Sequence, residues 1–259
     1  MAFSELSRPW RSAPHSNPAG GLLLCHGFTG SPQSLRPWAE HHAAAGWDVE
    51  LPLLPGHALT WQEMARTDER DWYGEVRAAA LALLERHERI SLGGLSMGGA
   101  LALRLAQDPG IAPRLDAVVL VNAVARPEHV WRVAPLLAPV LGSLPGIASD
   151  IRREGAAEEG YDRTPLRAVG AMRRLVSAVR RDLPRVTAPV LIAVSPQDHT
   201  VPPRSSDLIA ARVRGPVERL ALPDSYHVAT LDHDAERLFA ASSDFLLRRR
   251  AAGTDRPRP

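Results

Sequence analysis

Residues 90–99 read ISLGGLSMGG, and this stretch decides how the rest of the sequence is interpreted. Its first six residues are predicted to form a strand, and a helix is predicted to begin at Gly98. A serine in a Gly-x-Ser-x-Gly turn between a strand and a helix occupies a sharp, strained elbow that exposes its hydroxyl above the sheet. Ser96 is therefore the candidate nucleophile, and the flanking glycines are needed because a Cβ atom there would collide with neighbouring elements. The alternative interpretation is that Ser96 only caps the helix.

Strands and helices are predicted to alternate on both sides of this elbow. The expected strands lie at 21–25, 46–52, 90–95, 117–121, 189–195 and 217–222, and the expected helices at 34–45, 68–87, 98–107, 205–213 and 234–249. Such alternation is typical of an α/β fold with a mostly parallel sheet flanked by helices. We expect a single domain over residues 1–259, with loosely ordered tails at 1–19 and 251–259.

Residues 125–185 interrupt the alternation. This segment is rich in proline, contains no convincing strand, and regains helical periodicity at 166–179. A long segment of this kind inside a compact domain is usually functional. We expect a helical cap, or lid, packed over the carboxyl edge of the sheet.

Composition excludes several classes of protein. Of the 259 residues, 45% are hydrophobic and the formal net charge is +2, which argues against a mainly disordered chain. All 31 basic residues are arginine, with no run longer than three (residues 248–250), so nucleic-acid binding is not expected. The apolar runs are too short to span a bilayer and no signal peptide is evident, so we expect a cytoplasmic protein without an integral membrane segment. The single cysteine, Cys25, excludes an intrachain disulfide.

Two loops after later strands offer the groups that would activate the serine. In this fold the expected chain order is serine, acid, histidine, which favours Asp198 after the fifth strand and His227 after the sixth. His227 would remove the serine proton and later return it, while Asp198 would hold the imidazole tautomer. The competing residues are those close to His227 or Asp198 in sequence: Asp224, Asp232, Asp234, His199 and His233.

A glycine-rich loop follows the first strand, at residues 26–30. In this architecture the backbone N–H of Phe28 and that of Met97 would face the oxygen that becomes negative in a tetrahedral intermediate. The alternative is a turn without a role. His26 precedes the serine and is expected to be structural. The ten histidines form no obvious ligand set and the glycines match no phosphate-binding fingerprint, so no metal and no cofactor are expected.

Four motifs together resemble the bacterial monoacylglycerol lipases and related carboxylesterases, which have the α/β-hydrolase fold. The motifs lie at 26–34, 94–99, 198–203 and 225–232, and the resemblance extends over about residues 21–247. It implies a triad of Ser96, Asp198 and His227, with Phe28 and Met97 as oxyanion donors.

The same resemblance implies substrate contacts in the cap. Residues 144–150 resemble the family's lid, and Ile147 would narrow the acyl route near the nucleophile. Glu158, shortly before the stretch Tyr161-Asp-Arg-Thr-Pro165, would bind the glycerol hydroxyls. A slip of one residue would exchange it with Glu159, and either glutamate could instead be a solvated lid carboxylate.

These observations predict a serine ester hydrolase that acts through an acyl-enzyme on a small lipid-like monoester, with monoacylglycerol as the first choice. A carboxylesterase for short-chain or xenobiotic esters is the nearest alternative, and a catalytically silent binding protein is the alternative of another class. Transient contact of the lid with a lipid surface stays open, as does the oligomeric state.

Overall fold

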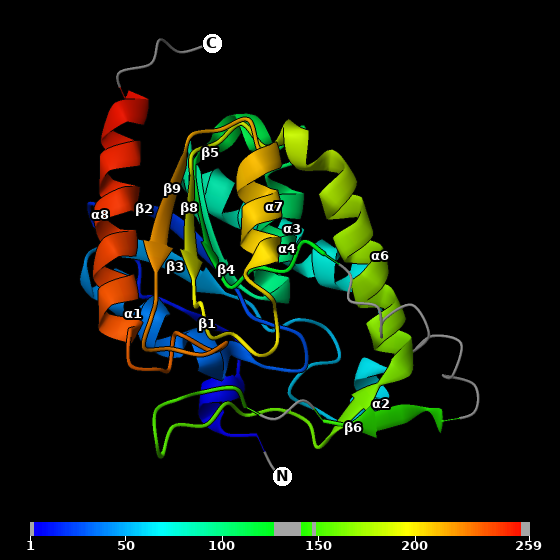
Figure 1. The fold of residues 1–259 in the computed structure, drawn as a ribbon. Helices are drawn as coiled ribbons and strands as arrows, with labels where there is room; N and C mark the ends of the chain where they lie inside the picture. The colour runs from blue at the N-terminus through cyan, green and yellow to red at the C-terminus, as the bar shows by residue number, and fades with distance from the viewer. Residues whose placement is uncertain (1–2, 127–140, 147–148, 255–259) are drawn as a thin grey trace.

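A mostly parallel sheet lies at the centre of the computed structural model, which describes residues 3–126, 141–146 and 149–254 (Figure 1). The sheet has seven strands in the order β1-β3-β2-β4-β5-β8-β9. Their bounds are β1 (Trp10–Arg11), β2 (Gly20–Cys25), β3 (Trp47–Leu51), β4 (Ile90–Leu95), β5 (Leu115–Val121), β8 (Val190–Val194) and β9 (Val217–Ala221). Only the pair β1–β3 is antiparallel. The predicted sheet is confirmed.

Helices cover both faces of the sheet. One face carries α1 (Arg36–Ala44) and α8 (Ala235–Thr254), the blue and red helices of Figure 1. The other carries α3 (Glu69–Arg86), α4 (Met97–Leu105) and α7 (Arg204–Arg212), with α6 (Leu166–Asp182) packed on the outside of α3 and α4. Shorter helical segments are η1 (Glu5–Ser7), η2 (Pro32–Leu35), α2 (Trp61–Met64), η3 (Ala112–Arg114) and η4 (Leu183–Arg185).

Strand β2 shows why this sheet is buried on both sides. Successive side chains of a strand point to opposite faces. Leu22 and Leu24 accordingly pack with α1 and α8, whereas Leu23 and Cys25 pack with α3 and α4. All four are fully buried, which explains why the strand reads as a continuous apolar run.

The structure corrects two expectations about the cap and the amino-terminal tail. Within the cap, β6 (Ser143–Pro145) and β7 (Arg163–Pro165) form a small antiparallel sheet where no strand was expected. Cap residues 127–140 lie outside the described residues. The segment 3–19 is not loosely held throughout, because β1 pairs with β3 and the Ser7 hydroxyl is buried against Ser31 at 2.6 Å.

The carboxyl-terminal helix is longer than expected. Helix α8 continues through residues 251–254, which were expected to belong to a tail, and residues 255–259 are not described. Within the three described ranges, no helix combines the length and apolar character that crossing a bilayer would need.

Two glycines of the elbow allow backbone to approach backbone. A Cβ atom on Gly98 would lie 1.8 Å from the carbonyl oxygen of Cys25 in β2. A Cβ atom on Gly94 would lie 2.3 Å from the carbonyl of Gly98. Because carbonyl groups cannot rotate away as flexible side chains can, β4, α4 and β2 pack this closely only without side chains at these two positions.

We therefore expect Gly98→Ala to lower the free energy of unfolding by about 3 kcal/mol or more, since the new methyl group must displace backbone. Urea denaturation followed by circular dichroism measures this change. Gly74→Ala is the matched control, because Gly74 is exposed on α3 and nothing lies within 4 Å of its added Cβ atom. It should raise stability by about 0.5–1 kcal/mol. Equal effects of the two substitutions would contradict this account of the elbow.

Candidate active site

Ser96 lies at the elbow between β4 and α4 in a strained backbone conformation. Its φ is 56° and its ψ is −117°, a combination of backbone angles that residues other than glycine rarely adopt. Its hydroxyl makes no capping hydrogen bond to the helix. The helix-cap alternative is therefore unsupported, and the side chain lines a cavity at the carboxyl edge of the sheet.

Asp198 and His227 come from separate loops and form a buried pair. The Nδ1 atom of His227 lies 2.8 Å from Oδ2 of Asp198, and the two side chains are 9% and 1% exposed. The other carboxylate oxygen, Oδ1, accepts the N–H groups of Thr200 and Val201 at 2.8 and 2.7 Å. This places Nδ1–H against the acid and leaves Nε2 as the basic nitrogen.

The competing carboxylates make structural hydrogen bonds instead. Asp232 accepts the backbone N–H groups of Arg152, Arg153 and Tyr226. Asp234 accepts the N–H of Asp224 and the hydroxyl of Ser225. Among the competing histidines, His199 pairs with Asp150 at 2.8 Å.

One cavity brings the predicted groups together. Ser96 and His227 both line it, along with Phe28 and Glu158. The rest of the wall is mostly apolar, with contributions from Leu95, Met172, Val201 and Val228. The site therefore combines a hydroxyl, an imidazole and a carboxylate with an apolar surface.

The two predicted oxyanion donors are placed differently. Met97 is the first residue of α4, so its N–H has no carbonyl partner within the helix. The positive end of the helix dipole adds to its attraction for a negative oxygen. Phe28 lines the cavity on the loop after β2, beside Gly27, whose added Cβ atom would be 3.5 Å from Cβ of Ser96. Both N–H groups thus belong to segments adjoining the nucleophile.

His26 supports the loop that carries Phe28. Its Nε2 accepts the backbone N–H of Leu54 at 3.1 Å, so its Nδ1 donates to the carbonyl of Gly27 at 3.0 Å. Burial lowers the pKa of His26 to about 3, which keeps the ring neutral. His26 therefore acts as a structural hydrogen-bonding residue.

The two cap glutamates point to different places. Glu158 lines the cavity, with Oε1 so near Gly30 that an added Cβ atom there would be 2.6 Å away. Burial raises the pKa of the Glu158 carboxyl above its ordinary value. Glu159 instead accepts the N–H of Ser4 at 2.9 Å and the hydroxyl of Ser7 at 2.6 Å. Only Glu158 is thus placed to meet a ligand in the cavity.

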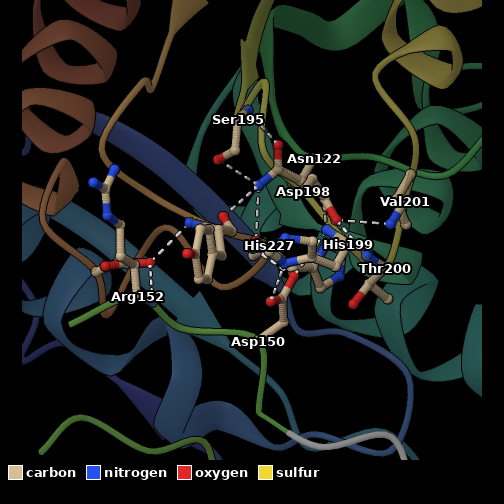
Figure 2. Close-up of polar contacts among 11 residues, drawn as sticks. Asn122, Asp150, Arg152, Ser195, Asp198, His199, Thr200, Val201 and His227 are labelled. Atoms are coloured by element: carbon tan, nitrogen blue, oxygen red, sulfur yellow. Dashed lines mark hydrogen bonds and ion pairs between the residues drawn. The ribbon is translucent and has the colours of Figure 1, made fainter. Parts of the chain in front are cut away.

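Asn122, which was not predicted from the sequence to belong to the site, follows β5 in the left-handed region at φ 44°. Its Oδ1 accepts the N–H of Ser195, and its Nδ2 donates to the Ser195 hydroxyl and to the carbonyls of Tyr226 and His227 (Figure 2). One amide therefore joins three loops at the carboxyl edge. Its place directly after a predicted strand was the sequence feature that could have identified Asn122 as part of the site.

Two further expectations concern the acyl route and metal binding. Ile147 lies outside the described residues, so its predicted place in the acyl route stays a prediction. Among the residues that are described, no three His, Cys, Asp or Glu side chains gather as a metal site would require.

We expect buried histidines to make the protein sensitive to acid. Burial lowers the pKa of His26 to about 3 and that of His57 to about 4, against about 6.5 when unfolded. Between pH 6.5 and 4 the unfolded chain binds protons that the folded chain does not, so stability is full above pH 6.5 and falls below it. His57→Gln should reduce this fall by up to about 1.4 kcal/mol per pH unit. Urea denaturation at a series of pH values measures the slopes, and parallel slopes would contradict the prediction.

Comparisons with known proteins show to which family the chain is related. The family model described as the alpha/beta hydrolase family matches residues 22–241. The chain is 37% identical to a thermostable monoacylglycerol lipase of Bacillus sp. (strain H-257), over 87% of this chain and 89% of that protein. It is 25% identical to a carboxylesterase of Bacillus subtilis (strain 168), over 87% and 91%.

Solved structures of lipolytic enzymes are also similar to this chain. A structure from work on the metagenome-derived lipolytic enzymes LipS and LipT superposes with a TM-score of 0.89 at 37% identity, covering 94% of this chain and 98% of that one. Paleococcus ferrophilus monoacylglycerol lipase shares the fold with a TM-score of 0.74 at 18% identity, covering 93% and 99%. On the family match, the identities and the superposition, this chain belongs to the alpha/beta hydrolase family.

Proposed function

We propose that this protein is a serine ester hydrolase that cleaves monoacylglycerols through an acyl-enzyme. The observation that carries the proposal is the buried 2.8 Å contact between His227 and Asp198, in a cavity that His227 shares with the strained Ser96. The names of the two relatives, a monoacylglycerol lipase and a carboxylesterase, support ester hydrolysis.

The first half of the reaction forms the acyl-enzyme. Oγ of Ser96 attacks the ester carbonyl carbon while Nε2 of His227 takes the hydroxyl proton. The carbonyl oxygen becomes negative and accepts hydrogen bonds from the N–H groups of Phe28 and Met97. When the tetrahedral intermediate collapses, the carbon–oxygen bond to the alcohol breaks and His227 gives its proton to the leaving oxygen.

The second half repeats these steps with water as the nucleophile. His227 removes a proton from water, the hydroxyl adds to the acyl carbon, and the bond to Ser96 breaks as His227 returns the proton. Asp198 stabilises the imidazolium formed in each half, because its buried carboxylate lies against Nδ1. Every step uses protein groups, substrate and water.

The cavity wall suggests the substrate class. Its apolar part, including Met172, Val201 and Val228, suits an acyl chain. Glu158 offers carboxylate oxygens that would accept hydrogen bonds from glycerol hydroxyls, which charge makes stronger than neutral ones. This combination favours a monoester of a polyol over a simple alkyl ester.

Several sequence-based expectations are retained as part of this proposal. We propose that residues 125–185 act as a lid that shields the acyl route, with transient contact to lipid surfaces, and that Ile147 narrows this route. We further propose a cytoplasmic location.

The proposal predicts hydrolysis of 1-lauroylglycerol and loss of that activity in Ser96→Ala. We expect kcat to fall by about 1,000-fold or more, because the variant lacks the hydroxyl that is proposed to form the acyl-enzyme. Fatty-acid release measures the rate, and thermal melting checks that the variant is folded. A folded Ser96→Ala protein with a tenth of the wild-type activity would contradict the proposal. Turnover of short p-nitrophenyl esters alone would favour the carboxylesterase alternative, and no turnover of any ester would favour the silent binding protein.

A second prediction separates the two cap glutamates. Glu158→Gln should raise KM for 1-lauroylglycerol about tenfold, since losing one hydrogen bond to a charged group costs about 1.5 kcal/mol. KM for p-nitrophenyl laurate, which has no glycerol hydroxyls, should stay within about twofold by the same reasoning. Glu159→Gln is the control and should change neither value, because its carboxylate faces Ser4 and Ser7. A rise in KM for both esters in Glu158→Gln would contradict the assigned role.

A further inference from the structure

A carboxylate from the cap joins the two loops that carry the acid and the base. Asp150 lies between β6 and β7, and its Oδ2 accepts the backbone N–H of His199 at 3.0 Å and that of His227 at 3.2 Å. His199 directly follows the acid Asp198 in the chain. One oxygen atom thus contacts both loops.

We infer that Asp150 is a positioning residue that holds the backbone of His227 so that its imidazole keeps the hydrogen bond to Asp198 while Nε2 exchanges a proton with Ser96. The inference rests on the proposed function, because the role concerns the proposed base and acid. In this role Asp150 acts through the backbone of His227, which distinguishes it from the three residues of the triad.

The His227 peptide groups are held from two sides. Asp150 accepts the N–H of His227, and Asn122 donates to its carbonyl at 2.8 Å. In the view of Figure 2, Asn122 lies above His227 and Asp150 below it. Removing either contact would free one end of the residue whose imidazole must meet both Ser96 and Asp198.

Further contacts fix Asp150 itself. Its Oδ1 lies 2.8 Å from Nδ1 of His199, and its own carbonyl accepts the N–H of Val228 at 3.1 Å. Its side chain is 14% exposed, so water competes little for these bonds. Asp150 also lines the cavity beside Ser96. A residue of the substrate cavity is therefore bonded directly to the backbone of the proposed base.

The acceptor atom matters more than the charge in this arrangement. An asparagine at position 150 can place its carbonyl oxygen where Oδ2 lies and accept both N–H groups, with its amide facing Nδ1 of His199. Alanine offers no acceptor and leaves both N–H groups unpaired. Asp150→Asn should therefore rescue the function that Asp150→Ala loses.

A nearby contact supplies the control. Nη1 of Arg152 lies 3.4 Å from Oδ1 of Asp224 and joins the same cap segment to the same histidine loop through exposed side chains. Arg152→Ala removes a connection between cap and loop without touching the backbone of the base. It tests whether Asp150 does more than attach the cap.

The kinetic test compares these variants on p-nitrophenyl butyrate, whose short chain depends little on the acyl cavity. For Asp150→Ala we expect kcat to fall about 30-fold to 100-fold, because a catalytic group misplaced by about 1 Å can slow a reaction by about this factor. KM should stay within about threefold. Asp150→Asn should recover kcat to within about fivefold of wild type, and Arg152→Ala should match wild type. A kcat within threefold of wild type for Asp150→Ala, or equal losses in Asp150→Ala and Arg152→Ala, would overturn the inference.

A spectroscopic test does not depend on any substrate. The proton shared by Nδ1 of His227 and Asp198 should give a far-downfield proton resonance in wild type, Asp150→Asn and Arg152→Ala. It should broaden or vanish in Asp150→Ala, and an unchanged resonance there would overturn the inference. If wild type hydrolyses no ester, the proposed function fails, while this comparison still decides the role of Asp150.

Discussion

The contact between the backbone of Gly98 and the carbonyl of Cys25 is the constraint on which the site depends. It sets α4 directly against the end of β2, with no space for a side chain between them. This packing holds Ser96 at a φ of 56°, which an isolated chain would avoid. The strain places the hydroxyl at the carboxyl edge of the sheet, and the first N–H groups of α4 lie beside it. The nucleophile and one oxyanion donor are therefore consequences of a single close approach.

The remaining groups reach this edge because parallel strands all end there. The loops after β2, β8 and β9 converge on one cavity, together with the elbow after β4 and part of the cap. Their mutual positions rest on the Asn122 amide, which bonds backbone groups of Ser195 and His227, and on the contact between Asp198 and His227. Asp198 also accepts two backbone N–H groups of its own loop. Such networks are strong when every partner is satisfied, which suits a site that must keep its geometry through two reaction halves.

Features with a local pattern could be predicted from the sequence, and features made by distant contacts could not. The strand at 90–95 and the chain order of Ser96, Asp198 and His227 follow from local patterns. The three-residue strands β6 and β7 contain prolines and too few residues to show alternation. The choice between Glu158 and Glu159 depends on which way each side chain points, and the bridge made by Asp150 exists only once two loops meet.

The most direct test of the account is the structure of the protein after reaction with a long-chain alkyl fluorophosphonate. The account predicts one covalent adduct, on Oγ of Ser96. Its phosphoryl oxygen should lie within hydrogen-bonding distance of the N–H groups of Phe28 and Met97, and its alkyl chain should lie along the apolar cavity wall. An adduct on another residue, or a phosphoryl oxygen turned away from both N–H groups, would contradict the account.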